Sequence, residues 1–161
     1  MFKLHNDGAE YGGENAFKYL VGELVDNIYE HSNFKNAFVM AQKYKKKGSV
    51  EICFFDDGIS IPGNFESKGL IFSNDEQAIV EAINGLSTKS QDRGYGLSSN
   101  FKIFVNGLKG EILLVSRGGA VFVNEKAQKI YKLRDIYHIN GTLITVRIPY
   151  PIKKVNIYEY I

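Results

Sequence analysis

The sequence predicts a two-layer α+β sandwich, formed by one domain that spans residues 1–161. Three observations lead to this fold class. The early part of the chain carries segments with helical periodicity, the late part carries short strand-like segments between turn residues, and the length is sufficient to bury a core without disulfides. The composition, with 44% hydrophobic and 24% charged residues, is that of an ordinary globular protein.

Four stretches are predicted to be helical. Residues 14–31 form the strongest case, because their apolar residues recur at i, i+3, i+4 and i+7 and so cover one helix face. A second helix is expected over residues 36–46, stopped by Gly48. Two more are expected over residues 75–84 and 95–106. The apolar face of the first helix consists of Phe17, Leu20, Val21, Leu24, Val25 and Ile28.

Five segments have the composition of β-strands. They are residues 49–55, 111–117, 120–124, 128–133 and 142–148. Gly118 and Gly119 separate the second and third of these strands and predict a hairpin turn. Pro149 is expected to end the last strand, and residues 56–75 are expected to be irregular. Helices early and antiparallel strands late give the two-layer arrangement.

Charge and cysteine content exclude several classes of function. A net charge of +2 is too small to indicate a nucleic-acid partner, and the basic run at residues 43–47 is expected to be a solvated helix end. The single cysteine, Cys53, rules out a disulfide within the chain and indicates a reducing compartment. No stretch approaches the roughly 18 apolar residues of a membrane span, and residues 1–7 lack a signal-peptide pattern. We therefore expect a cytoplasmic protein.

The polar face of the first helix is the first candidate site. Glu23, Asn27, Glu30 and His31 fall opposite the apolar face, with Asp26 at its edge. A solvated surface explains most faces of this kind. However, Asn gains little in mid-helix on such a surface, whereas its amide oxygen is a hard ligand that suits Mg²⁺. A carboxylate one turn earlier can deprotonate an attacking hydroxyl or water.

Two glycine-containing loops are the next candidates. Asp56, Asp57 and Gly58 follow an apolar strand, which is typical either of an Asp-Gly turn or of a carboxylate held at a strand end to accept from an amino group such as adenine N6. Gly94 and Gly96 precede a helix, which is typical either of a flexible hinge or of a phosphate-binding helix start. Upstream of them, the hydroxyls and the lysine of Ser87-Thr88-Lys89-Ser90 either contact phosphates or form an exposed loop.

The order of these features resembles the motif series of the GHKL ATPases, the family of gyrase B, heat-shock chaperones, histidine kinases and mismatch-repair ATPases. The resemblance covers residues 14–149 and rests on Glu23-x-x-x-Asn27, Asp56-x-Gly58, Gly94-x-Gly96 and Gly141-Thr142. His31, four residues after the asparagine, and the block at residues 93–97 are most similar to the histidine-kinase-like and anti-sigma-factor serine kinase domains. The resemblance implies the Bergerat ATP-binding fold, with helices packed on one face of a mixed, mainly antiparallel sheet.

The resemblance also implies ATP and Mg²⁺ as cofactors and gives roles to the matching residues. Asn27 would bind Mg²⁺, and Glu23 would be the catalytic general base. Asp56 would bind the adenine amino group with Gly58 beside the base, and Thr142 would support Asp56. The remaining residues expected to contact the nucleotide are His31, Ser60, Ile61, Lys89, Gly94, Tyr95, Gly96 and Leu97.

Two positions depart from the family pattern. Ser60 stands where the adenine loop usually has a second glycine, and Asp92 stands where the phosphate block usually opens with one. Serine is small enough for the base still to fit. An anion at residue 92 would weaken triphosphate binding or shift the ATP lid, which the resemblance places at residues 65–94.

Three activities compete within this family. The first is phosphotransfer to a serine or threonine of a partner protein, and the second is the catalytic half of a histidine kinase. A self-contained histidine kinase is not expected, because neither His5 nor His138 lies on a helical hairpin. The third is an ATP-gated, hydrolysing interaction module, although residues 150–161 are too few for the further domain that such proteins usually carry. The expected partner is a phospho-acceptor or regulatory protein on another chain, with no nucleic acid or membrane, and a homodimer is among the expected states.

Overall fold

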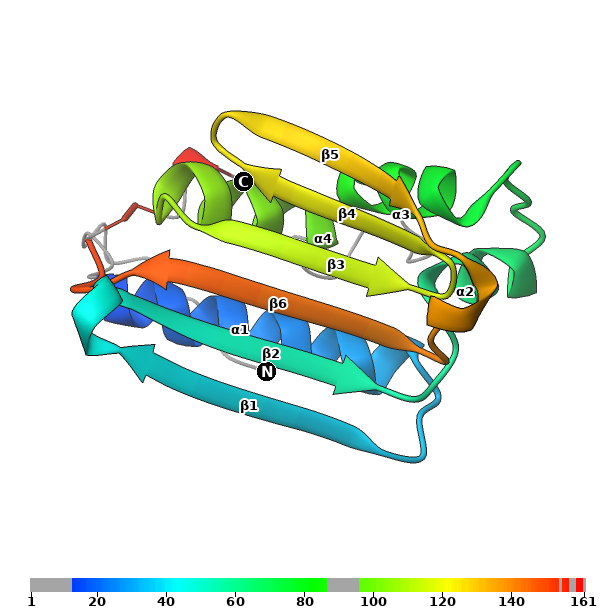
Figure 1. Ribbon diagram of the computed structural model, residues 1–161, viewed down its shortest axis with the longest axis horizontal. Helices are drawn as coiled ribbons and strands as arrows, with labels where there is room; N and C mark the ends of the chain where they lie inside the picture. Colours follow the sequence, from blue (N-terminus) through cyan, green and yellow to red (C-terminus); the bar gives the residue numbers. More distant parts are fainter. Residues whose placement is uncertain (1–12, 87–95, 154, 157–158, 161) are drawn as a thin grey trace.

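The computed structural model describes residues 13–86, 96–153, 155–156 and 159–160, and within the first helix it describes side chains from Lys18 onward. The chain forms an α+β fold in which helices cover one face of a six-stranded sheet (Figure 1). The helices are α1 (Gly13–His31), α2 (Ile61–Ser67), α3 (Asp75–Ile83) and α4 (Gly96–Lys102). The strands are β1 (Ala37–Tyr44), β2 (Ser49–Asp56), β3 (Glu111–Ser116), β4 (Gly119–Asn124), β5 (Ala127–Lys132) and β6 (Thr142–Pro149).

The sheet has the strand order β1-β2-β6-β3-β4-β5. All five strand pairings are antiparallel, so the expected mixed component is not found among the described strands. The last strand in sequence, β6, lies near the centre, between β2 and β3. The end of β2 and the beginning of β6 are therefore neighbours, which brings together two motifs that are 86 residues apart, Asp56 and Thr142.

The predicted helix over residues 36–46 is wrong, because this segment is the edge strand β1. Gly48 adopts a φ of +59° after a short 3-10 turn over Lys45–Lys47, and the chain reverses there so that Tyr44 pairs with Ser49. An apolar run this short fits either period, and pairing with β2 decides the outcome. The basic run at residues 43–47 is thus the end of a strand and its turn, not a helix end.

The prediction that residues 56–75 are irregular is wrong in its middle, where α2 forms. Ser60 is the N-cap of this helix, and its hydroxyl accepts a hydrogen bond from the N–H of Gly63 at 3.1 Å. Pro62 stands in the first turn, where its missing N–H costs nothing. A serine cap followed by a proline is a helix-start signal that outweighs the glycines around it.

The remaining elements follow the sequence closely. The hairpin of β3 and β4 turns at Arg117–Gly118, and the strand predicted over residues 142–148 is β6, extended by Pro149. The predicted helix over residues 95–106 divides into α4 and a π-helical turn over Ile103–Gly107. No helix in the described part of the chain is long and apolar enough to cross a bilayer.

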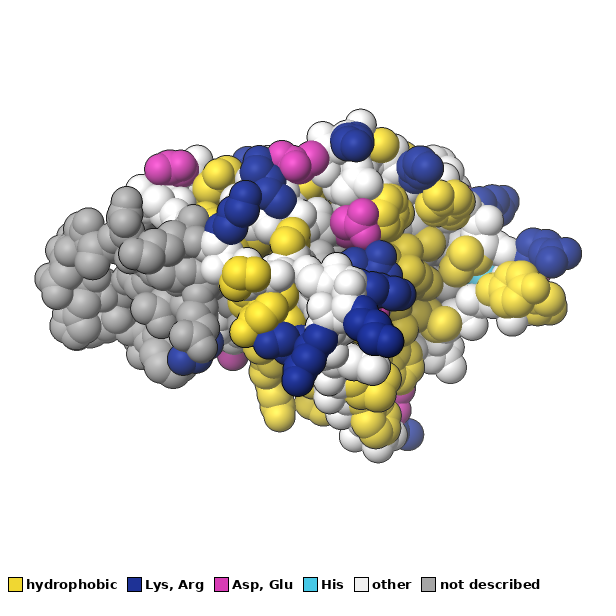
Figure 2. Space-filling view, turned by 60° about the vertical axis from the view of Figure 1, so that its left-hand side comes forward, with side chains coloured by type: hydrophobic (Ala, Val, Ile, Leu, Met, Phe, Trp, Pro, Cys, Tyr) yellow, Lys and Arg dark blue, Asp and Glu magenta, His cyan; other side chains and the backbone are white. Residues whose placement is uncertain are grey.

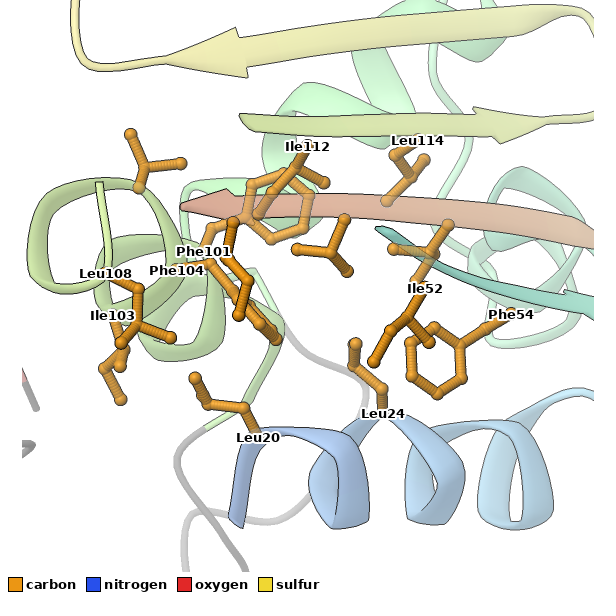
Figure 3. Close-up of a cluster of buried hydrophobic side chains, with 14 of the residues drawn as sticks. Leu20, Leu24, Ile52, Phe54, Phe101, Ile103, Phe104, Leu108, Ile112 and Leu114 are labelled. Atoms are coloured by element: carbon orange, nitrogen blue, oxygen red, sulfur yellow. The ribbon is translucent and has the colours of Figure 1, made fainter. Parts of the chain in front are cut away.

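The main core lies between α1, α4 and the covered face of the sheet (Figure 3). Leu24 of α1 points toward Ile52 and Phe54 of β2. Leu20 points instead toward Ile103 and Phe104, and all of these side chains are buried. Burial of one such side chain stabilises the fold by about 1.5–3 kcal/mol. The core fixes α1 against β2 and so sets where the polar face of α1 lies. Phe101, Ile103, Phe104, Leu108, Ile112 and Leu114 continue the core toward α4 and β3.

Arg117, in the β3–β4 turn, ties α2 and α3 to the sheet. Its guanidinium donates to Glu66 of α2 at 2.6 and 2.9 Å and to Asp75 of α3 at 2.8 Å, and the N–H of Gly118 donates to Asp75 at 2.9 Å. Desolvation opposes ionisation of Asp75, but the hydrogen bonds from Arg117 and Gly118 outweigh it and lower its pKa. These contacts hold α2 and α3 at the end of the sheet where Asp56 lies.

Candidate functional site

Three polar residues form a row across the covered face of the sheet at one end. Asp56 closes β2 and pairs with Thr142 of β6, which pairs in turn with Ser116 of β3. The Ser116 hydroxyl lies 3.0 Å from the Thr142 hydroxyl and donates to the Gly141 carbonyl at 3.2 Å. Asp56 and Ser116 are both buried, so three neighbouring strands present polar groups where the rest of this face is apolar.

Asp56 is a carboxylate held in place by short-range hydrogen bonds. Only 2% of its surface is exposed. The N–H of Gly58 donates to its Oδ1 at 3.0 Å. The hydroxyl of Ser32, at the end of α1, is shared between this carboxylate and the Ile28 carbonyl, which lies 2.9 Å from it. Desolvation raises the pKa of Asp56 even though both hydrogen bonds lower it. A carboxylate has about four acceptor positions, so these two bonds leave acceptor capacity for a donor from a ligand.

Asp57, the next residue, has a structural role. Its carboxylate accepts from the backbone N–H groups of Lys35 and Asn36 and from the Asn36 side chain, each at 2.8 Å. These hydrogen bonds, led by the backbone N–H of Asn36, lower its pKa. The two aspartates therefore have different roles. Asp57 fixes the chain between α1 and β1, whereas Asp56 faces the covered side of the sheet.

Gly58 lies against the end of α1. A Cβ on this residue would stand 2.6 Å from the backbone carbon of Ser32, and the neighbouring N–H of Ile59 donates to the Ser32 carbonyl. The sequence suggested a glycine that admits the adenine ring. The described contacts show a different reason for the glycine. The Asp56 loop approaches the α1 backbone so closely that a Cβ would not fit.

Gly141, just before β6, is constrained even more strongly. It has a φ of +90°, and a Cβ there would stand 2.7 Å from the backbone carbon of Asp56 and 3.0 Å from the Cα of Asp57. Thr142 is brought beside Asp56 only because this glycine lets the two backbones touch. The Gly141-Thr142 motif is therefore a structural support of the Asp56 position.

The polar face of α1 lies beside this row. Glu23, Asn27 and His31 are half-buried, and Ser32 follows directly at the helix end. Glu23 stands one turn before Asn27. His31 lies in the last turn, and its Nε2 atom lies 3.9 Å from a carboxylate oxygen of Glu30. Since Ser32 contacts both Asp56 and Gly58, the structure places the polar end of α1 next to the Asp56 loop.

Asn27 has the property expected of a ligand. Its Nδ2 atom is buried and has no hydrogen-bond partner within the described part of the protein. Rotation of the amide exchanges this atom for the carbonyl oxygen, a hard ligand that fits Mg²⁺. Among the described residues no three His, Cys, Asp or Glu side chains gather into a metal site. A magnesium ion here would be held by few protein ligands together with phosphates and water, as is usual for this ion.

The other residues expected to contact the nucleotide lie in different parts of the chain, and some of them are outside the described residues. Ser60 is buried and caps α2 with its hydroxyl, and the N–H of Ile61 donates to Ser116 at 2.9 Å, so this pair connects α2 to the polar row. Gly96 and Leu97 begin α4, which packs against α1 and α3. The expected contacts of Lys89, Gly94 and Tyr95, together with Asp92, lie outside the described residues, as does the part of the expected lid after residue 86.

Several site residues gave no signal in the sequence. Ser32 and Ser116 are isolated serines, and only the register of the sheet and the position of the helix end bring them to Asp56. Asn100 of α4 is also unexpected, since its side chain is fully buried and neither amide atom is hydrogen-bonded to a described residue. Asn100 lies on a helix of mixed polarity before an apolar turn, so its place in the sequence resembles that of a surface residue.

Comparisons with known proteins find similarity in structure but none in sequence. No family model matches the chain, and no curated protein matches it. Among solved structures it is similar to the ATPase and transducer domains of DNA topoisomerase II from Balamuthia mandrillaris, with 12% identity and a TM-score of 0.47. The match covers 86% of this chain and 38% of that one, so the chain spans well under half of the topoisomerase fragment.

Proposed function

We propose that the chain binds ATP with Mg²⁺ on the covered side of the sheet, where β2 ends and β6 begins. The observation that carries this proposal is the buried Asp56 carboxylate, held by Gly58 and Ser32 at the end of a strand. Adenine presents an N6 amino donor, and a fixed carboxylate is a suitable acceptor for it. The Thr142 and Ser116 hydroxyls beside Asp56 add polar groups that can bind the base directly or through water.

The polar face of α1 would bind the phosphate end of the nucleotide. Asn27 would hold the Mg²⁺ ion, because its buried amide has an atom without a partner among the described residues. When bound, this ion offsets the negative charge of the phosphates. Gly96 and Leu97, at the start of α4, lie on a helix that packs against α1 and would border the same space.

The finer proposal is phosphotransfer to a hydroxyl of a partner protein. Glu23 would be the general base, since it lies one turn before Asn27 on the same helix and can receive the proton of the acceptor hydroxyl. This step is supported by the resemblance of residues 27–31 to the anti-sigma-factor serine kinases, whereas residues 23–27 are more similar to the gyrase motif. Where no acceptor is present, the same carboxylate would activate water, which corresponds to an ATP-gated switch.

Calorimetric titration of the protein with ATP in the presence of Mg²⁺ tests the adenine site. Asp56→Asn should weaken ATP binding by about 10- to 100-fold, because a hydrogen bond to a charged acceptor contributes about 1.5–3 kcal/mol. GTP should bind wild type more weakly than ATP does, since guanine presents an acceptor at the corresponding position. The difference between wild type and variant should shrink as the pH falls through the raised pKa of Asp56, because a protonated carboxyl is a weaker acceptor.

A matched control for this titration is Asp135→Asn, which makes the same change at a fully exposed carboxylate. It should bind ATP as wild type does. Equal ATP affinity in wild type and Asp56→Asn, or no ATP binding by a folded wild-type protein, would contradict the proposed function.

Glu23→Gln tests the chemistry separately from binding. The variant should bind ATP within about threefold of wild type and lose at least about 100-fold in turnover, the usual contribution of general-base catalysis. Incubation with γ-labelled ATP and cell extract then distinguishes the two outcomes. A labelled protein band supports phosphotransfer, release of phosphate alone supports the ATP-gated switch, and undiminished turnover removes Glu23 from the mechanism.

A further inference from the structure

The face of the sheet opposite the helices carries side chains that no element of the described chain covers. Figure 1 shows the strands in front and the helices behind them. On this open face, Phe38 and Met40 of β1 are 58% and 67% exposed, and Leu113 of β3 is 37% exposed. Exposed large hydrophobic side chains that are contiguous usually indicate an interaction surface.

The strand register arranges these side chains in three rows that run across the strands. Row A consists of Phe38, Phe55, Leu143, Val115, Ala120 and Tyr131. Row B consists of Met40, Cys53, Thr145, Leu113, Phe122 and Lys129. Row C is polar and contains Gln42, Glu51, Arg147 and Glu111. Figure 2 views this face obliquely and shows a hydrophobic band across the molecule beside a group of charged side chains.

We propose that this open face is the interface of a symmetric dimer, in which two copies of the chain pack sheet against sheet. The size of the face fits this occupant. Six strands about 4.8 Å apart and three rows about 6.8 Å apart give roughly 29 by 20 Å, or about 600 Å² of flat area. Side-chain relief brings the buried surface near the roughly 800 Å² per partner of a standard-size interface.

The distribution of charge selects one orientation of the two copies. Arg147 donates to Glu51 at 2.6 Å and to Glu111 at 3.2 Å within one chain. A two-fold axis that lies between the two sheets and runs perpendicular to the strands would lay row A of one copy against row C of the other. This orientation would bury apolar side chains against these charges. A two-fold axis parallel to the strands, between β6 and β3, instead lays each row on the same row of the other copy.

This second orientation also matches side chains across the interface. It exchanges β6 with β3, so Arg147 lies opposite the partner's Glu111, and Leu143 lies opposite the partner's Val115. One strand further out, a small side chain meets a large one, since β2 and β4 exchange and Cys53 of row B faces the partner's Phe122. Aligned sheets pack about 10 Å apart with interdigitating side chains, and their angle of roughly 30° disturbs the matches least near the axis.

Sedimentation velocity over a range of protein concentrations tests the dimer. Wild type should dimerise, and Leu113→Lys should dimerise at least about tenfold more weakly, because a charge would be buried at the centre of the apolar rows. The matched control is Ile71→Lys, which makes the same kind of change at a residue that is 84% exposed and lies between α2 and α3, away from the sheet. Circular dichroism establishes that each variant is folded.

Charge reversal tests the orientation. Arg147→Glu should weaken the dimer by placing carboxylates opposite each other, and the double variant Arg147→Glu with Glu111→Arg should restore it. The thiol of Cys53, the only cysteine of the chain, gives an independent readout, since it lies on row B and should react more slowly with a thiol reagent as the dimer forms. A wild-type protein that stays monomeric at every concentration, or that binds only a different protein through this face, would overturn the proposal.

Discussion

Gly141→Ala is expected to lower the free energy of unfolding by about 3–5 kcal/mol, from contributions of backbone strain and of overpacking. A side chain at a φ of +90° is strained wherever it stands, and here the Cβ would also press on the backbone of Asp56 and Asp57. The strand pair β2–β6 would have to separate at the end that carries Asp56 and Thr142. Thermal unfolding should therefore shift down by roughly 10 °C or more, and ATP binding should weaken in the protein that remains folded.

Two other glycines separate the causes of this effect. Gly69 also has a positive φ, +79°, but a Cβ there would meet no described atom within 4 Å, so Gly69→Ala measures the backbone strain alone. Gly22 is an exposed mid-helix residue with open space around it, and Gly22→Ala should stabilise the protein by up to about 1 kcal/mol. If Gly141→Ala lowers the free energy of unfolding no more than Gly69→Ala does, the contact of the added Cβ with the Asp56 backbone contributes nothing beyond backbone strain.

Gly58→Ala is expected to destabilise the protein by about 2–4 kcal/mol, which reflects overpacking against backbone that cannot give way. The added Cβ would collide with the Ser32 carbonyl group, so either the Asp56 loop or the end of α1 must move. Chemical denaturation of the variant, compared with Gly22→Ala, measures this loss. The hydrogen bonds from Gly58 and Ser32 to Asp56 should weaken with it, since both depend on the same contact.

The outcome also distinguishes two reasons for a glycine at this position. If the glycine serves the close packing of the loop on α1, the variant loses stability whether or not nucleotide is present. If it serves only to admit the adenine ring, the variant keeps its stability and loses ATP affinity. Unchanged stability with weakened ATP binding would therefore rule out close packing as the reason for Gly58.

Local signals in the sequence were sufficient for most of the fold. The periodicity of α1, the glycines of the β3–β4 turn and the alternation of β6 each identified an element correctly. The two errors have different causes. Residues 36–46 carry a short apolar run that fits either period, and pairing with the next strand, β2, decides the structure. Residues 61–67 form a helix through a local serine cap and proline rather than through an apolar stripe.

The candidate site was only partly accessible to sequence reasoning. The residues that carry distinctive chemistry, Asn27 and Asp56, stand out in the sequence because an asparagine in mid-helix and an aspartate after a buried strand are unusual choices. Their supports do not stand out. Ser32, Ser116 and Arg117 act through the register of the sheet and the end of α1, which no local pattern specifies.

The edge strand β1 has a consequence for the behaviour of the protein at high concentration. An exposed, largely apolar edge of eight residues is a template on which other chains can add strands, and so it favours aggregation. Its last residues and the turn that follows carry Lys43, Lys45, Lys46 and Lys47, and the ammonium group of Lys43 folds over the ring of Tyr150 at 3.3 Å. A strand added along this edge would have to desolvate these charges. The basic run thus acts as a gatekeeper against fibril-like growth, and its protection weakens as salt screens the charges.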